Sequence, residues 1–79
     1  MTFLEAMELI KNHPAGPRVK AVRPVGDKWF VFADKYKTMY GKEIIRFNLT
    51  NDVSQSGNAY SPTYEDLHSE WEEYKWRKQ

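Results

Sequence analysis

The stretch from Lys28 to Lys37, KWFVFADKYK, constrains the fold more than any other part of the chain. Its residues alternate as in a β-strand, in which successive side chains point to opposite faces of a sheet. One face carries Trp29, Val31 and Ala33, and the other carries Phe30 and Phe32. Because both faces are apolar, the stretch predicts a central strand with a neighbour on each side.

Two further stretches predict those neighbouring strands. Residues 18–23, RVKAVR, alternate basic and apolar side chains, the pattern of a strand with one face in water. Residues 42–49, KEIIRFNL, alternate as well, and Gly41 in the preceding TMYG turn can take a positive φ. We therefore expect residues 28–37 and 42–49 to form an antiparallel pair. Residues 50–59, TNDVSQSGNA, predict a polar loop.

Both ends of the chain carry helix-start signals. Thr2 and Glu5 have the spacing of a capping box, and Phe3, Met7 and Ile10 follow at helical intervals until NHPAGP ends the pattern. Thr63 and Asp66 repeat the capping spacing and predict a second helix. Its core face would carry Tyr64, Leu67 and Trp71. Residues 71–76 fit either a continued helix or a short strand.

This order of elements predicts a single α+β domain over residues 1–79. We expect an N-terminal helix, an antiparallel sheet of three to four strands and a C-terminal helix. A chain of 79 residues buries only about 60% of its unfolded surface, and without cysteine it has neither disulfides nor thiolate zinc sites. A homo-oligomer is therefore expected. With no secretion signal and no long apolar run, we expect a soluble, cytoplasmic protein without a membrane segment.

The net charge of +1 conceals an uneven distribution. Residues 11–46 hold nine basic and three acidic side chains, whereas residues 65–73 hold five acids and no lysine or arginine. A basic, aromatic sheet could bind single-stranded nucleic acid, but the acidic segment and a pI near 8.0 argue against a long polyanion. A small phosphorylated ligand suits this charge better. We expect Lys20 and Lys28 to be solvated and Phe30 and Phe32 to lie in the core.

The sequence offers no constellation typical of catalysis or metal binding. Its two histidines, His13 and His68, are far apart and lack metal-ligand spacing. Catalysis by acid and base would need a pair of carboxylates set at a working distance, whereas the carboxylates of residues 65–73 have the pattern of a solvated helix face. We therefore expect neither an enzyme, nor a metal site, nor a cofactor.

Three segments together carry a family resemblance: TFLEAMELIKN, the basic strand that ends at Arg23, and YSPTYEDLHSEWE. They resemble the type 2 Thoeris anti-defence proteins, small phage proteins that open with a helix of the form sF.eAl..lk.G and close near W.PS..Dll..DW. The matching positions are Phe3, Glu5, Ala6, Ile10, Arg23, Tyr60, Pro62, Thr63, Asp66, Leu67 and Trp71. The chain departs from the pattern at HPAGP, which replaces a glycine, and at Tyr60, which replaces a tryptophan. It also has Val25 where the family usually has a tryptophan, and Trp29, four positions further on, could fill the same space.

The resemblance implies a sponge, which binds a cyclic nucleotide immune signal without cleaving it. The ligand would be of the cyclic ADP-ribose class or a cyclic oligonucleotide, held between subunits of a homo-oligomer in the host cell. Arg23 would pair with a phosphate, and Trp29 and Tyr60 would stack on adenine. Ser61 and Thr63 would bind a phosphate or ribose oxygen at the helix start, and Asp66 would accept a ribose hydroxyl.

Two other functions fit the residues. A small phage inhibitor or adaptor could bind a host protein through the acidic, aromatic C-terminal segment, since tryptophan and tyrosine are common interface anchors. Binding of single-stranded nucleic acid by the basic sheet is the third possibility.

Overall fold

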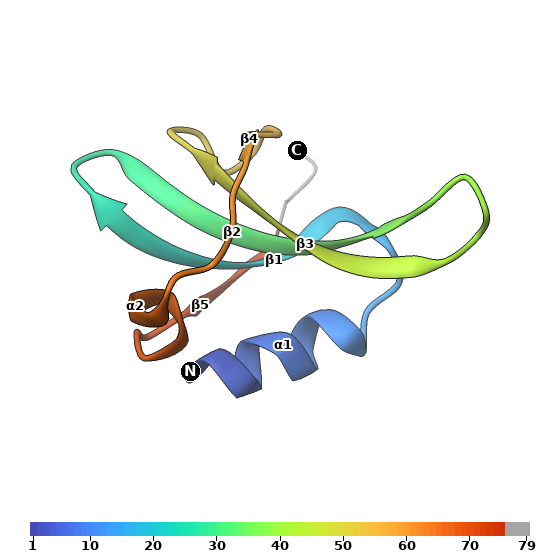
Figure 1. Cartoon of the computed structure of the whole chain (residues 1–79), viewed down its shortest axis with the longest axis horizontal. Helices are drawn as coiled ribbons and strands as arrows, with labels where there is room; N and C mark the ends of the chain where they lie inside the picture. The colour runs from blue at the N-terminus through green and yellow to red at the C-terminus, as the bar shows by residue number, and fades with distance from the viewer. Residues whose placement is uncertain (76–79) are drawn as a thin grey trace.

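A computed structural model describes residues 1–75, which form one α+β unit with two helices and five strands (Figure 1). The sheet has the order β4-β3-β2-β1-β5, and all neighbouring strands are antiparallel. The elements, in chain order, are α1 (Phe3–Lys11), β1 (Gly16–Gly26), β2 (Trp29–Lys37), β3 (Glu43–Thr50), β4 (Asn58–Ala59), α2 (Tyr64–Leu67) and β5 (Glu72–Lys75).

The structure confirms the α+β class, the N-terminal helix and the central position of β2 between β1 and β3. The number of strands was wrong, because the sheet has five strands instead of three or four. One additional strand, β4, lies within the predicted 50–59 loop and pairs with the end of β3.

The predicted C-terminal helix was also wrong. Helix α2 has only four residues, and Glu72–Lys75 form β5, which pairs with Val19–Val22 of β1. A helix this short gains little from its own hydrogen bonds, whereas an alternating EEYK segment can add to the free edge of a sheet. The alternative left open for residues 71–76 is therefore settled as strand for residues 72–75, and Trp76 lies outside the described residues.

The capping box at the first helix is formed as predicted. The Glu5 N–H donates to the Thr2 hydroxyl at 3.2 Å, and the Thr2 N–H donates to the Glu5 carboxylate at 2.8 Å. Two orphan N–H groups of the first turn are thereby satisfied. These hydrogen bonds lower the pKa of Glu5.

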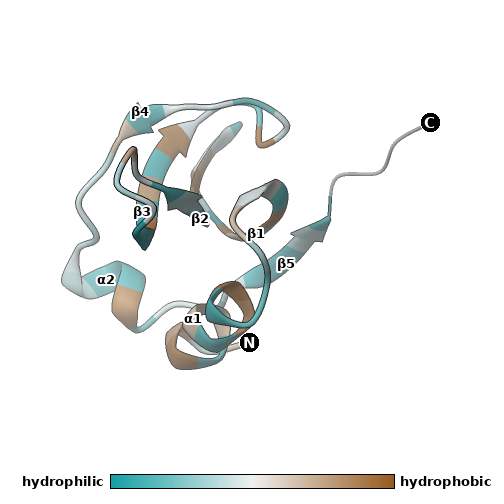
Figure 2. Ribbon diagram, turned by 90° about the vertical axis from the view of Figure 1, so that its right-hand side faces the viewer, coloured by the Kyte–Doolittle hydropathy of each residue, from teal (hydrophilic) through white to brown (hydrophobic). Residues whose placement is uncertain are grey.

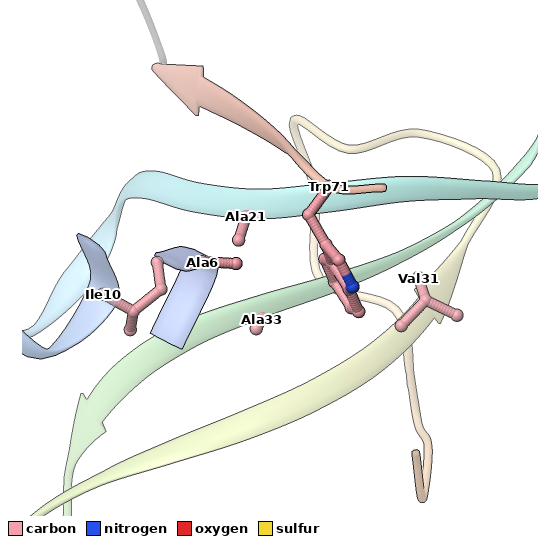
Figure 3. Packing of buried hydrophobic residues seen from close by; sticks show 6 residues of the cluster. All are labelled: Ala6, Ile10, Ala21, Val31, Ala33 and Trp71. Carbon is pink, nitrogen blue, oxygen red and sulfur yellow. The ribbon is translucent and has the colours of Figure 1, made fainter. Parts of the chain in front are cut away.

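One face of the sheet packs against α1 and forms the hydrophobic core, and Figure 3 shows six buried residues of this core. Ala21 and Ala33 are direct partners across β1 and β2, and their small side chains let Ala6 of α1 approach the sheet. The core consists of Ala6, Ile10, Ala21, Val31, Ala33 and Trp71.

Trp71 is the largest core side chain and is fully buried, as predicted. Its ring meets Phe3 at a centroid distance of 5.7 Å and Phe47 at 6.4 Å, both edge to face, a favourable geometry for aromatic pairs. Tyr64 and Leu67 are 78% and 46% exposed, so their predicted place in the core was wrong. Helix α2 ends before Trp71 and does not place the three side chains on one face.

The opposite face of the sheet is mixed in polarity and carries the 51–57 loop. Lys20, predicted to be solvated, is only 2% exposed, because its Nζ donates to the carbonyl oxygens of Val53 at 2.8 Å and Gln55 at 3.4 Å. The same ammonium lies 4.1 Å from the ring centroid of Phe32, which is buried as predicted, and Phe30 is half-buried. Burial lowers the pKa of Lys20.

The two helices of the described chain are short, and neither has the length and apolar composition needed to cross a membrane.

Gly57 offers a direct test of how the 51–57 loop returns to the sheet. A Cβ at this position would lie 2.8 Å from the carbonyl carbon of Leu49 and closer still to its oxygen, so the backbone would have to move. We expect Gly57→Ala to lower the free energy of unfolding by about 1–3 kcal/mol, as overpacking does. Urea unfolding followed by tryptophan fluorescence measures this change.

Gly26→Ala is the matched control, because a Cβ there would meet nothing within 4 Å. Its effect should stay within about 0.5 kcal/mol. Equal effects of the two substitutions would contradict the close approach of Gly57 to β3.

Candidate functional site

A buried ion pair joins β1 to α2. Arg23 lies near the end of β1, and its guanidinium donates to Oδ1 of Asp66. Asp66 is fully buried and Arg23 is 8% exposed. A second guanidinium nitrogen lies 3.6 Å from the carboxylate of Glu65, whose side chain is 81% exposed. Arg23 is therefore held firmly by one carboxylate and loosely by another.

The second carboxylate oxygen of Asp66 organises the segment that precedes α2. Oδ2 accepts the Tyr60 hydroxyl at 2.7 Å, the Thr63 N–H at 2.7 Å and the Thr63 hydroxyl at 3.1 Å. Burial alone would raise the pKa of Asp66, but the hydrogen bonds from Thr63, Tyr60 and Arg23 outweigh it and hold the pKa below 3.8. The hydrogen bond to Asp66 raises the pKa of Tyr60. We refer to Arg23, Tyr60, Thr63 and Asp66 as the Arg23–Asp66 cluster.

Hydrogen bonds to backbone carbonyl groups fix both ends of the segment that carries this cluster. The Tyr60 N–H donates to the Phe47 carbonyl at 3.0 Å, which keeps Tyr60 beside β3. At the other end, the indole N–H of Trp71 donates to the Asp66 carbonyl at 2.9 Å. Figure 1 shows this segment leaving β4 and crossing to α2 on the side of the sheet where α1 lies.

Of the six predicted ligand-binding residues, the structure brings four together: Arg23, Tyr60, Thr63 and Asp66. Trp29, the first residue of β2, lines a separate cavity of about 210 Å³ with residues that include Asn51, Ser56 and Asn58. It is 44% exposed. Ser61 lies between Tyr60 and Thr63 in the chain, and its side chain is exposed.

The cluster restricts what each predicted residue can do. In this structure both oxygens of Asp66 already accept protein donors, so a ribose hydroxyl would have to displace one of them. Arg23 has five N–H donors and its contact with the exposed Glu65 is the looser of its two ion pairs, so an anion at Arg23 would have to displace Glu65. Helix α2 has four residues, so the phosphate site expected at its start gains little from a helix dipole.

Two residues beside the cluster were not predicted as part of a site. Glu65 is the second partner of Arg23, and its place directly before Asp66 in the capping segment was the available signal. Tyr64 was assigned to the core but is exposed, with its ring centroid 4.3 Å from that of His68. In residues 1–75, no three His, Asp or Glu side chains come together as ligands for a metal ion.

The pKa of Asp66 gives a test of the cluster. A carboxylate whose folded pKa lies below its unfolded value stabilises the fold above the unfolded pKa, and this stabilisation is lost as the pH falls through the folded pKa. Tyr60→Phe removes one donor to this charge and should cost about 1.5–3 kcal/mol at pH 7. The difference between wild type and variant should be present above pH 3.8 and should shrink as the pH falls through the folded pKa of Asp66, which lies below 3.8.

Urea unfolding at a series of pH values measures this difference. Tyr40→Phe is the control, because Tyr40 is 90% exposed in the β2–β3 turn and should show no effect at any pH. A Tyr60→Phe effect that did not shrink at any pH below 3.8 at which the protein stays folded would show that the Asp66 charge is not its cause.

The geometry of the cluster has to be interpreted without a relative of known function. The chain matched no protein-family model, no curated protein and no solved structure.

Proposed function

We propose that the protein binds a cyclic nucleotide signal of the cyclic ADP-ribose or cyclic oligonucleotide class and sequesters it without cleavage. One observation carries the proposal: the three segments that resemble the anti-defence family, although far apart in sequence, contact one another. Phe3 of the opening segment packs on Trp71 of the closing segment, and Arg23 of the middle segment pairs with Asp66. Residues of one functional signature are expected to meet in this way.

The groups around the cluster have the chemistry that such a ligand needs. Arg23 would bind a phosphate after releasing Glu65, the exposed Ser61 hydroxyl would donate to a phosphate or ribose oxygen, and the Thr63 hydroxyl would do so after releasing Asp66. Tyr64 exposes aromatic surface beside the cluster, and Trp29 exposes it in the separate cavity of about 210 Å³, so a ligand whose bases stack on both would have to span the two places. Sequestration needs tight binding only, so the site requires no nucleophile or general base. A homo-oligomer, as expected from the small size, would complete the site with groups from a second subunit.

The first test is a release experiment. The purified protein is incubated with a panel of cyclic nucleotides, freed of unbound ligand and then heated. We expect one member of the panel to be recovered intact, as identified by mass spectrometry. A modified product would indicate an enzyme, and failure of a broad panel to bind would contradict the proposal.

Trp29→Ala is the sharpest variant for the same assay. Loss of a base-stacking ring costs about 1–3 kcal/mol, so we expect affinity for the retained ligand to fall about 5- to 150-fold, with little change in unfolding because Trp29 is 44% exposed. Tyr40→Ala, at the other end of β2, should leave affinity unchanged. Arg23→Ala is unsuitable, since it would leave the Asp66 charge buried without its partner.

The adaptor hypothesis is favoured by a different observation. Helix α2 leaves Tyr64 and Leu67 exposed beside the acidic Glu65, a pattern suited to a basic, apolar surface on another protein. It predicts that Tyr64→Ser abolishes co-purification of one host protein while the nucleotide panel fails to bind. Binding of single-stranded nucleic acid has less support, because Lys20 and Arg23 of β1 are buried and occupied by protein acceptors.

A further inference from the structure

Strand β5 is an edge strand of the sheet, and within residues 1–75 it pairs with β1 along one of its two edges. The other end of the order is β4, which has two residues and offers little length for pairing. Figure 2 shows the two end strands on opposite sides of the molecule. An edge strand presents unpaired N–H and C=O groups, which can template pairing with another chain.

The contacts of Trp71 show which backbone groups of β5 point away from β1. The Trp71 N–H donates to the Met1 carbonyl at 2.7 Å, and the Met1 amine donates to the Trp71 carbonyl at 2.8 Å, so both Trp71 groups face the outer edge. Along a β-strand, the N–H and C=O groups of successive residues point to alternate edges of the strand. The N–H and C=O groups of Glu73 and Lys75 therefore also face outward, and those of Glu72 and Tyr74 face β1.

The side chains at these two outward positions have opposite charges. Glu73 and Lys75 lie on the same face of the sheet, and their charged groups are 3.5 Å apart within the chain. Tyr74, half-buried, lies on the other face, where its strand partner is Lys20. Within residues 1–75, Met1 occupies the edge beside Trp71, and no other described residue pairs with the outer edge of the short segment from Glu73 to Lys75.

We propose that β5 pairs with β5 of a second copy of this chain, antiparallel and with Tyr74 opposite Tyr74 of that copy. In this register Glu73 lies opposite Lys75 of the second copy, and Lys75 lies opposite its Glu73. The backbone groups of Glu73 and Lys75 face outward, so each of these two residue pairs forms backbone hydrogen bonds together with an ion pair between the side chains.

The charge pattern selects this register over its neighbour. The two neighbouring registers that keep the same faces of the sheets aligned place Glu73 opposite Glu73, or Lys75 opposite Lys75, and like charges directly opposite each other are destabilising. In the proposed register the two Tyr74 residues occupy the position where opposing side chains approach most closely. A pair of aromatic rings then lies on the two-fold axis.

The surface next to β5 extends this contact. A groove of about 230 Å³ has an apolar lining from Val22, Pro24, Phe30 and Val53, and Glu72, Glu73 and Tyr74 of β5 border it. The Tyr74 ring of a second copy would lie diagonally across from Glu72, at the border of this groove. The pairing uses no group of the Arg23–Asp66 cluster, so it stands whether or not the protein binds a nucleotide.

Variants that reverse the charge at position 73, at position 75 or at both test the proposed register. Sedimentation equilibrium over a concentration series should show wild type passing from monomer to dimer. Glu73→Lys and Lys75→Glu should each weaken dimerisation about tenfold or more, equivalent to about 1.4 kcal/mol, and the double variant Glu73→Lys/Lys75→Glu should restore it. Glu8→Lys, which changes the same charge on the exposed face of α1, should have little effect.

Amide exchange of wild type gives a second measurement that needs no variant. On concentration, the amides of Glu73 and Lys75 should exchange more slowly, whereas those of Glu72 and Tyr74, which already face β1, should not change. A protein that stays monomeric at millimolar concentration would overturn the proposal. So would a dimer insensitive to both single charge reversals, or one that the double variant does not restore.

Discussion

The fold of this protein depends on the ion pair between Arg23 and Asp66. Removal of two charges from water offsets much of their attraction, so a buried pair is weak evidence for net stability, and what the structure shows of this pair is that it joins β1 to α2. Asp66 meets Arg23, Tyr60 and Thr63 at once, and these contacts hold the segment before α2 against β1. The indole of Trp71 then donates to the Asp66 carbonyl and fills the core.

The two faces of the sheet are stabilised by different means. Helix α1 covers one face with apolar contacts, which the paired alanines of β1 and β2 allow to be close. The other face is covered by a loop, which lacks apolar side chains in sufficient number and is held by the ammonium of Lys20. A chain of this size has too few large apolar residues for two cores, so a buried polar contact takes the place of the second one.

The sequence was sufficient to predict the helix and strands that are determined by residues close together in the chain. Alternation identified β2 and its antiparallel pairing with β3, and the spacing of Thr2 and Glu5 identified the start of α1. The C-terminal segment was misassigned because its helical spacing competes with pairing to β1, a contact between residues about fifty positions apart that no local pattern reveals. Lys20 was misassigned for the same reason, since its acceptors belong to a distant loop.

For the candidate site, the sequence predicted which residues lie together but not which of their polar groups are already hydrogen-bonded. The capping spacing placed Thr63 beside Asp66, and the resemblance placed Arg23 in the same site, but neither showed that the carboxylate would be fully occupied by protein donors. Trp29 was grouped with these residues by the resemblance, whereas the hairpin between β1 and β2 places it in a different cavity. Whether a side chain is free for a ligand depends on its partners in space.

The attachment of the 51–57 loop through Lys20 has an evolutionary consequence. The ammonium recognises the carbonyl oxygens of Val53 and Gln55, and every amino acid carries that oxygen. Substitutions at these two positions can therefore change the chemistry of the surface beside β1 and β5, to which Val53 contributes, without releasing the loop. The molecule can diversify its outer surface here while its backbone stays in place.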